Sequence, residues 1–571
     1  MKVTNKIFIL FFLALGIAGC EKDFLDTPPQ DVLVDETYWT SEVNVKTFAY
    51  GFYTSYFSGY GSGYTWGKYF SGQSLNDDFA PTNPPRFTQQ VPTSGGGWSF
   101  AWVRKANIFI DRVQGVDMEE EAINHWTGIG RFFRALEYHD LVKDFGDVPY
   151  YDKELAENDN EMLYRERDER TFVMDRVLED FRFAAENVRD NVENEGQEVD
   201  RSVVLGFMSR VFLYEGTWQK YHENNNEKAA EYLEAAKWAA QEIIESGNFS
   251  LGNYREVFNS LDLSGNPEVL LYREYEEGMV THSLNSYNNK EPQTGVSKDG
   301  IESYLAEDGL PIGISALYQG DKGIENLMAN RDPRIYETFV SDELRINGVD
   351  PNYSTTGIAT HKFLNEDIAD EPRGSSNLNP TDAPIIRYGE ILVNYAEAAY
   401  ELSTVGGATF AQEDLDKSIN VLRDRPGINL PYLEVSGDQP AVNGQVYDDP
   451  QRDSGVAPIL WEIRRERRVE LMFEGFRLDD LKRWKKLEYT DMVQYPDINR
   501  GAWIDKSNYP DANLESLAVT GGGDKGYLIP ASAEEALRTF EDPKVYLEPI
   551  PLDQITLYRD QGVELEQNPG W

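Results

Sequence analysis

Apolar side chains recur at every third or fourth position through much of the chain, which is the spacing of an α-helix with one buried face. Two such stretches lie within residues 102–147, and the second ends where Gly146 and Pro149 interrupt the pattern. The same period returns over residues 170–190, 201–217, 227–246, 388–404, 412–424, 457–474 and 477–488. Because many of these stretches follow one another after short connectors, the pattern predicts a mainly α-helical protein built from helix pairs.

The stretch from Ala229 to Phe249 indicates how closely such helices pack. Its apolar face is formed by Ala229, Leu233, Ala236, Ala240, Ile243 and Ile244. Small side chains at this spacing let two helices approach closely, which is typical of tetratricopeptide-like helix pairs. Gly247 then supplies a C-cap. The repeat is not regular enough for a solenoid, so we expect several helix pairs stacked into a scaffold.

Three long tracts lack the helical period. Residues 50–100, 276–385 and 430–456 are rich in turn-forming residues and are predicted to be loops. Residues 268–275 are expected to form an isolated strand. Long irregular segments on a helical scaffold usually carry function, so we expect ligand-binding residues in these loops.

The first twenty residues have the order of a lipoprotein export signal. Lys2 and Lys6 precede an apolar run, residues 7–17, which is too short to span a bilayer because a spanning helix needs ~20 apolar residues. Small residues then lead to Cys20, the only cysteine of the chain. The pattern predicts a signal peptide over residues 1–19 and lipidation of Cys20. The alternative is an ordinary cleavage site followed by a chance cysteine.

The rest of the chain is expected to form a tether and one domain. Residues 20–36 contain two adjacent prolines and are predicted to be a membrane tether, and residues 37–571 are predicted to be the domain. A single cysteine forms no intrachain disulfide, so this domain depends on its packed core. The formal net charge of −45 argues against binding to nucleic acid, although it also suits solubility in a saline habitat.

Motifs of common catalytic centres are missing from the sequence. The five histidines never pair at metal-ligand spacing, and neither a Gly-x-Ser-x-Gly elbow nor a phosphate-binding glycine loop with its lysine occurs. We therefore predict a protein that is not an enzyme and that needs no metal or cofactor. Carboxylates are abundant, however, so an exported glycoside hydrolase or lyase remains the alternative.

Glu466, Glu470 and Glu474 are four residues apart in one predicted helix, so they share a face. Four arginines are interleaved with them. One interpretation is an acid–base cluster; the other is a helix held by ion pairs to itself and its neighbours, for example between Arg467 and Glu470. We favour the structural interpretation, because charge runs on helices are usually solvated or paired.

The chain is rich in aromatic residues, with 33 Tyr, 28 Phe and 11 Trp. Tyrosine and tryptophan offer an apolar face and a polar edge, which suits sugar rings as well as a protein core. Trp126, Phe133 and Trp238 lie on predicted helix faces and are expected in the core. The candidates for glycan contact lie in the predicted loops, where binding and packing are both open; they are Trp98, Trp66, Tyr64, Tyr69 and Tyr287.

Several short blocks occur in one order along the chain. They are residues 24–29 (FLDTPP), 104–109 (RKANIF), 130–136 (GRFFRAL), 145–149 (FGDVP), 331–334 (RDPR), 387–398 (RYGEILVNYAEA), 423–427 (RDRPG), 466–477 (ERRVELMFEGFR) and 567–571 (QNPGW). As an ordered set they resemble the SusD/RagB family of nutrient-uptake lipoproteins. The sequence departs from the family at Pro426, where alanine is more usual, and this position is at a helix end.

The resemblance implies a fold and a role. The fold is a domain of tetratricopeptide-like helix pairs with an irregular, ligand-bearing half, in which the Glu/Arg helix is scaffold. The role is capture of an oligosaccharide or polysaccharide by a lipid-anchored protein at the surface of the outer membrane, and its delivery to a TonB-dependent transporter. Ligand residues of the family lie in variable loops, so the resemblance does not assign them in this sequence.

Overall fold

The computed structural model describes residues 38–67, 69, 75–156, 158–289 and 295–571. The predicted signal peptide, the tether of residues 20–36 and Cys20 lie outside these ranges, so these assignments stay predictions. Within the described ranges, no helix combines the length and the apolar composition needed to cross a membrane.

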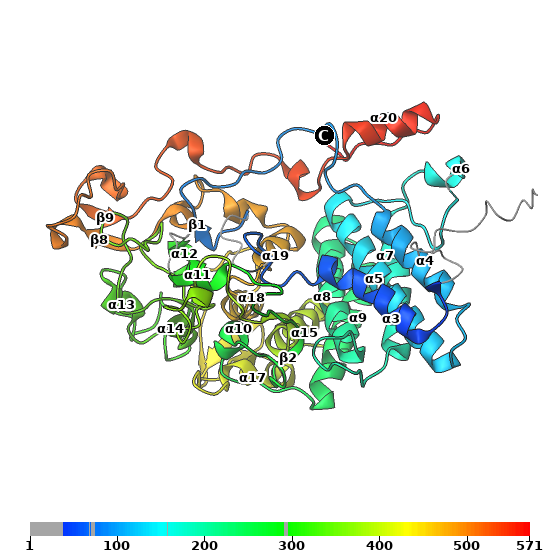
Figure 1. Cartoon of the computed structure of the whole chain (residues 1–571). Helices are drawn as coiled ribbons and strands as arrows, with labels where there is room; N and C mark the ends of the chain where they lie inside the picture. Colours follow the sequence, from blue (N-terminus) through cyan, green and yellow to red (C-terminus); the bar gives the residue numbers. More distant parts are fainter. Residues whose placement is uncertain (1–37, 68, 70–74, 157, 290–294) are drawn as a thin grey trace, which may run out of the picture.

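One half of the molecule is a stack of long helices, which Figure 1 shows side by side at the right. Helix α4 packs on α5, α5 on α7, α7 on α8, α8 on α9, and α9 on α15. Their bounds are α3 Glu42–Tyr56, α4 Ala101–Val113, α5 Glu120–Phe145, α7 Arg170–Asn187, α8 Arg201–Trp218, α9 Asn226–Ser246 and α15 Tyr388–Ser403. This arrangement confirms the predicted mainly α-helical fold.

Small residues bring these helices together, as the sequence predicted. A Cβ atom on Gly130 of α5 would lie 2.7 Å from Ile110 of α4, and one on Gly216 of α8 would lie 2.6 Å from Leu233 of α9. Both distances are shorter than packed carbon atoms allow, so glycine is needed at these crossings. The main core fills the stack, where the rings of Phe52 and Phe133 stack 4.7 Å apart.

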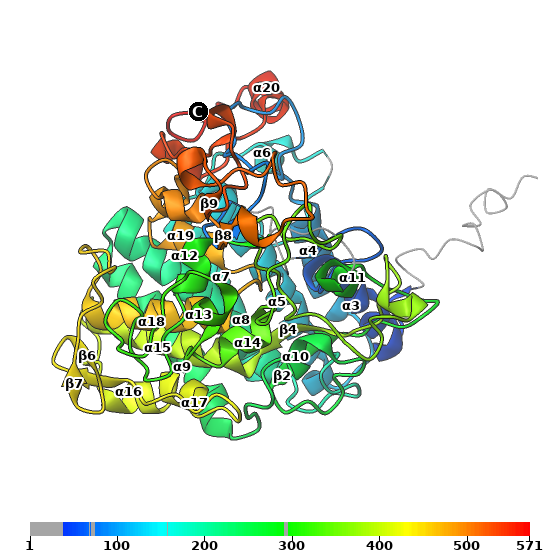
Figure 2. The same ribbon diagram turned by 90° about the vertical axis from the view of Figure 1, so that its left-hand side faces the viewer.

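The other half is built from short helices and small sheets (Figure 1, left; Figure 2). Its longest pairing is antiparallel, between β2 (Val269–Arg273) and β4 (Ala383–Arg387). The strand predicted over residues 268–275 is therefore present, but it is paired rather than isolated. The short helices of this half include α10 Glu256–Asn259, α11 Leu284–Asn289, α12 Lys298–Glu302, α13 Ile324–Met328 and α14 Arg334–Thr338.

Some predicted boundaries were wrong. Helix α3 runs to Tyr56, so the first residues of the predicted loop 50–100 are helical. The helix predicted over 412–424 is two short helices, α16 (Gln412–Asp416) and α17 (Ile419–Arg423). Trp238, which was expected in the core, is 38% exposed because it lies on the outer face of α9, whereas Trp126 and Phe133 are buried as expected.

The helix predicted over 457–474 is α18 (Pro458–Glu470), and it ends before Glu474. Phe473 and Gly475 both adopt left-handed backbone conformations, with φ of 67° and 85°, and these turn the chain into α19 (Arg477–Arg483). Glu466 and Glu470 therefore share a helix, and Glu474 reaches the same region from the following turn.

These three glutamates form buried ion pairs with basic residues of the irregular half. The carboxylate of Glu470 lies 2.8 Å from Arg387 of β4, 2.7 Å from Arg425 and 3.3 Å from Arg334 of α14. The remaining pairs are Glu466 with Arg334 (2.9 Å) and Arg423 (2.6 Å), and Glu474 with Arg387 (2.7 Å) and Lys362 (2.8 Å). All of these side chains are buried, so the pairs fix the elements of the irregular half against α18.

One expected pair is not formed. Arg467 donates to Asp480 of α19 at 2.8 Å rather than to Glu470, three residues further along its own helix. Arg467 therefore links α18 to α19, whereas Arg465 pairs along the helix with Glu462 at 3.1 Å.

Candidate functional site

The loop from Ser58 to Gly67 doubles back on itself tightly. Ser62 and Thr65 form an isolated bridge across its tip, and the Gly61 amide donates to the Ser58 carbonyl at 2.8 Å. A Cβ atom on Gly67 would lie 1.7 Å from the Gly59 carbonyl oxygen, and Gly61 has a left-handed φ of 86°. Only glycine fits these two positions, so the glycine-rich sequence specifies a compact loop rather than a flexible one.

Hydrogen bonds hold this loop to the irregular half. The hydroxyl of Tyr275 donates to the Gly61 carbonyl at 2.7 Å, and Arg273, at the end of β2, donates to the Ser58 carbonyl at 2.7 Å. The Gly63 amide donates to the carbonyl of Thr281 at 2.7 Å. The loop is thus fixed before any ligand arrives.

Two further segments, residues 280–287 and 374–379, lie beside this loop and are hydrogen-bonded to each other. The backbones of His282 and Asn379 exchange hydrogen bonds of 3.1 and 3.0 Å, and the hydroxyl of Thr281 donates to the carbonyl of Asn377 at 2.7 Å. The amide of Ser376 donates to the hydroxyl of Ser286, on α11, at 3.0 Å. Hydrogen bonds therefore join residues 58–67, 280–287 and 374–379 into one unit, which we call the loop site.

Three of the five predicted aromatic residues meet at the loop site. The rings of Trp66 and Tyr287 are 4.2 Å apart at an interplanar angle of 83°. Tyr64 is 70% exposed, and its hydroxyl is 2.5 Å from that of Ser376. The site therefore combines apolar ring faces with hydroxyl and amide groups, which is the chemistry that a sugar ring requires. Their role in binding stays a prediction.

The other two predicted residues lie elsewhere. Tyr69 is buried behind the loop site, where its ring meets that of Tyr60 edge-on at 5.0 Å and its hydroxyl donates to the Pro384 carbonyl. Trp98 is 6% exposed, and its ring packs edge-on against Phe145 of α5 at 5.1 Å. Burial of both side chains leaves little ring surface for a ligand.

The polar partners at the loop site could not be found from the sequence. Tyr64 and Ser376 are 312 positions apart, and a serine or asparagine in a long loop carries no local signal of its spatial neighbours. The glycine pattern around Tyr64 was the available clue, because it marks a tight turn that displays its aromatic side chains.

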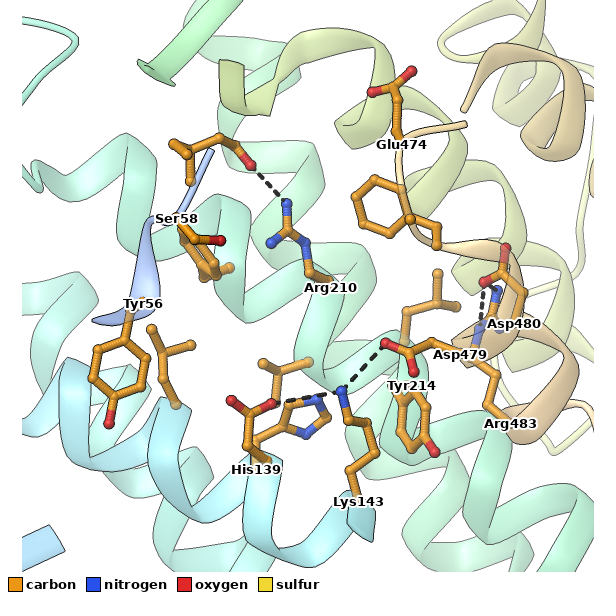
Figure 3. A pocket seen from close by; sticks show the side chains of 18 of the residues that line it. Tyr56, Ser58, His139, Lys143, Arg210, Tyr214, Glu474, Asp479, Asp480 and Arg483 are labelled. Atoms are coloured by element: carbon orange, nitrogen blue, oxygen red, sulfur yellow. Dashed lines mark hydrogen bonds and ion pairs between the residues drawn. The ribbon is translucent and has the colours of Figure 1, made fainter. Parts of the chain in front are cut away.

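A cavity that adjoins the loop site, because Ser58 and Gly59 line it, lies where α5 and α8 meet the segment 474–483, and Figure 3 shows its side chains. Lys143 reaches Asp479 at 3.3 Å across it, and Arg210 is paired with Glu390 at 2.6 Å. Burial lowers the pKa of His139 to about 3, so this side chain is neutral. The cavity volume of about 110 Å³ is below the ~300 Å³ at which ligand pockets usually begin. We do not assign the oligosaccharide to it.

Comparison with known proteins identifies the family. A sequence model described as the SusD family matches residues 271–571, more than half of the chain. The chain belongs to the SusD family. A second model, described as "Starch-binding associating with outer membrane", matches residues 68–213.

Individual relatives agree with this assignment. A SusD-like protein of Formosa agariphila is 25% identical over 85% of this chain and 93% of its own length. A crystal structure of a SusD-like carbohydrate-binding protein of Bacteroides fragilis, 20% identical, superimposes with a TM-score of 0.68 over 91% of this chain and 99% of its own. A laminarin-binding SusD-like protein, 17% identical, reaches 0.53 over 93% of this chain and its whole length. The resemblance seen in the sequence is thereby confirmed.

Proposed function

We propose that this SusD-family protein binds an oligosaccharide at the loop site without cleaving it. The observation that carries the proposal is the edge-on pair of Trp66 and Tyr287, with Tyr64 exposed beside it. The C–H faces of a sugar ring stack on aromatic rings, and its hydroxyls hydrogen-bond to groups such as Ser376 and Asn377. Because the loop is already fixed, little ordering cost opposes binding.

The comparisons support a carbohydrate as the ligand. One structural neighbour is described as carbohydrate-binding, another as laminarin-binding, and the family model over residues 68–213 is described as starch-binding. These descriptions concern related proteins, and the chemistry of the loop site is consistent with them. They leave the identity of the sugar for this chain to experiment.

The alternative of a glycoside hydrolase or lyase is disfavoured by the state of the carboxylates that first suggested it. A glycosidase needs one carboxyl group with a raised pKa and a second one free to act on the substrate. Glu466 and Glu470 instead have pKa values below their ordinary range, because the charges of neighbouring arginines outweigh the effect of burial. Both are held in buried ion pairs.

We further propose that the protein is lipid-anchored through Cys20 at the surface of the outer membrane and delivers its ligand to a TonB-dependent transporter. The support is the order of signal peptide, small residues and cysteine in the sequence, together with the family model whose description names association with the outer membrane. A binding protein concentrates a sugar but does not carry it through a bilayer, so a channel must take over the ligand.

Titration calorimetry against a panel of neutral oligosaccharides tests the proposal, with product release followed in the same samples. Trp66→Ala should weaken binding at least tenfold, since truncating an aromatic hot spot costs ~2 kcal/mol or more. Trp238→Ala is the matched control, because Trp238 is an exposed tryptophan on α9 of the helical half. Equal affinity of Trp66→Ala and wild type, or release of cleaved sugar by the wild type, would contradict the proposal.

A further inference from the structure

A large hollow lies against helix α18, apart from the loop site. It has a volume of about 530 Å³ and is lined by side chains of α12, α18, the start of α19 and the segments 449–454 and 486–498. None of the described residues of the loop site lines it. Its volume falls within the ~300–1,000 Å³ of ordinary ligand pockets, and we call it the α18 hollow.

Helix α18 separates this hollow from the buried ion pairs. Trp461, Arg465 and Arg468 line the hollow and lie at intervals of four and three positions, so they share one face of the helix. Since each residue turns an α-helix by ~100°, Glu466 and Glu470 lie on the roughly opposite face. One face of α18 therefore carries the ion pairs that fix the irregular half, and another borders the hollow.

Three aromatic side chains reach the hollow from three segments. Trp461 comes from α18, Tyr489 from the 3-10 helix η4 (Leu487–Thr490) and Tyr495 from the chain that follows. The rings of Tyr489 and Tyr495 meet edge-on at 5.7 Å, and Tyr495 is 37% exposed. A smaller cavity of about 50 Å³ also borders Trp461 and Tyr489, so neither ring is closely packed on all sides.

Carboxylates hold two of these rings by their polar edges. The indole N–H of Trp461 donates to Asp449 at 3.0 Å, and the hydroxyl of Tyr489 donates to Asp453 at 2.5 Å. Asp453 also accepts from Lys486 at 2.7 Å. Because the rings are already oriented, a ligand that stacks on them pays little for ordering these side chains.

The charged groups of the hollow are paired with one another. Arg477 pairs with Asp77 at 2.7 Å, and Arg468 pairs with Asp78 at 2.7 Å and with Asp299 at 2.8 Å. These pairs neutralise each other, so the hollow selects an ion of neither sign. A ligand that fits it is polar and uncharged.

Hydrogen-bonding capacity remains beside the rings. The side chains of Gln451 and Ser454 are exposed, and within the described part of the chain neither makes a hydrogen bond. Asp299 is 44% exposed, and its carboxylate has lone pairs beyond the one that Arg468 engages. Donors and acceptors that surround aromatic rings match the hydroxyls and C–H faces of a sugar.

We propose that the α18 hollow is a second saccharide site, which takes a neutral sugar unit independently of the loop site. Tyr495, Tyr489 and Trp461 supply the apolar surface, and the exposed amide, hydroxyl and carboxylate groups bind the sugar hydroxyls. The assignment to a saccharide rests on the proposed function, whereas the presence of a ligand site in this hollow does not.

The test starts from full-length Trp66→Ala protein, in which the loop site is weakened. Calorimetry with short neutral oligosaccharides of glucose, mannose, xylose or galactose should detect residual binding, with a dissociation constant on the order of 1 mM or lower. Adding Tyr495→Ala should weaken this residual binding at least tenfold, since Tyr495 is the most exposed of the three rings. Ser454→Trp should do the same, because it fills the hollow and removes neither an aromatic ring nor an ion pair.

Tyr432→Ala is the matched control, because Tyr432 is a tyrosine with 50% exposure that does not line the hollow. In the same background it should leave the residual binding unchanged. Melting temperatures show whether Tyr495→Ala and Ser454→Trp are folded, and two variants of different kind separate loss of the site from loss of structure. Absence of residual binding in Trp66→Ala, or residual binding that both variants leave intact, would overturn the second site.

Failure of the loop site gives a different result. The single variant Trp66→Ala would then bind as the wild type does, while Tyr495→Ala and Ser454→Trp, each made in the wild type, would remove all binding. If both sites exist, the wild type binds two oligosaccharides per chain, and Trp66→Ala and Tyr495→Ala each bind one.

Discussion

Arg387 of β4 donates from its Nη1 to the carboxylate of Glu470, the last residue of α18, at 2.8 Å. The same nitrogen donates to Glu268 at 2.8 Å, so one guanidinium joins the main strand pair of the irregular half to the helix that supports it. Both partners are fully buried. The loop site is displayed by segments adjoining this strand pair, so the ion pair contributes to its position without contacting a ligand.

Glu470→Gln is expected to destabilise the protein strongly. Removing one partner of a buried ion pair leaves uncompensated charge and typically costs ~3–5 kcal/mol. Chemical denaturation measures the loss, and Glu413→Gln on the exposed α16 should be neutral. At temperatures where Glu470→Gln is still folded, its oligosaccharide affinity should equal that of the wild type. A folded variant that loses binding selectively would argue for a direct role of Glu470.

The contribution of the buried histidines to stability should fall as the pH drops below about 6.5, the ordinary histidine pKa. Burial lowers the pKa of His282 to about 3, and those of His139 and His222 to about 3 as well. Between these values each of these histidines binds more protons in the unfolded chain than in the folded one, so its contribution to stability is present at neutral pH and is lost with acidification. Each such histidine contributes up to about 1.4 kcal/mol per pH unit.

Melting curves from pH 7 to pH 4.5 check the direction of this pH dependence. His282→Asn keeps a polar side chain next to the Thr381 carbonyl, which His282 contacts at 2.9 Å, but it has no titrating group. Its melting temperature should be lower than that of the wild type at pH 7, and the difference between the two proteins should shrink as the pH falls. A parallel pH dependence of the two proteins would mean that His282 is not the group responsible.

Trp98 and Trp66 should respond differently to truncation. If Trp98 contacted the glycan, as its place in a predicted loop suggested, Trp98→Ala would weaken binding and leave the melting temperature nearly unchanged. Its burial against Phe145 and Phe100 now leads us to expect a loss of ~3–5 kcal/mol in stability. Trp66→Ala should weaken binding with a smaller loss of stability, because Trp66 is only partly buried against the core, and the measurement pairs calorimetry with thermal denaturation. A stable Trp98→Ala protein with weak binding would restore the original expectation.

The helical half could be predicted because the spacing of apolar residues that indicates a helix is local in the sequence. Positions three and four apart, such as Ala236 and Ala240, determine both the helix and its buried face, and the close approach of α8 and α9 follows from small residues there. The missed helix α3 buries Val45, Ala49 and Phe52 at the same spacing, so its signal was present next to the glycine-rich tract.

The irregular half could be predicted only in part, because its contacts are distant in the sequence. Strand β2 was found, whereas its partner β4 lies more than a hundred residues further along. Trp98 follows three glycines, which suggested a displayed side chain, yet Phe145 from the end of α5 covers it. In contrast, the glycines around Tyr64 hold a turn that does display its aromatic residue. The local sequence does not distinguish these two cases.

The last prediction concerns the partner in the membrane. If the chain is a lipid-anchored lid on a TonB-dependent transporter, it should co-purify with that transporter from outer membranes solubilised in mild detergent. A lid that seals a barrel needs a large contact, above ~2,000 Å² in total, which should survive affinity purification. Cys20→Ala should abolish partition with membranes, because each buried methylene of a lipid chain contributes ~0.8 kcal/mol to anchoring. Trp66→Ala is the matched control, since it should lose sugar binding at the loop site and retain the transporter. Recovery of the wild-type protein alone, under conditions that preserve other membrane complexes, would favour an independent surface adhesin instead.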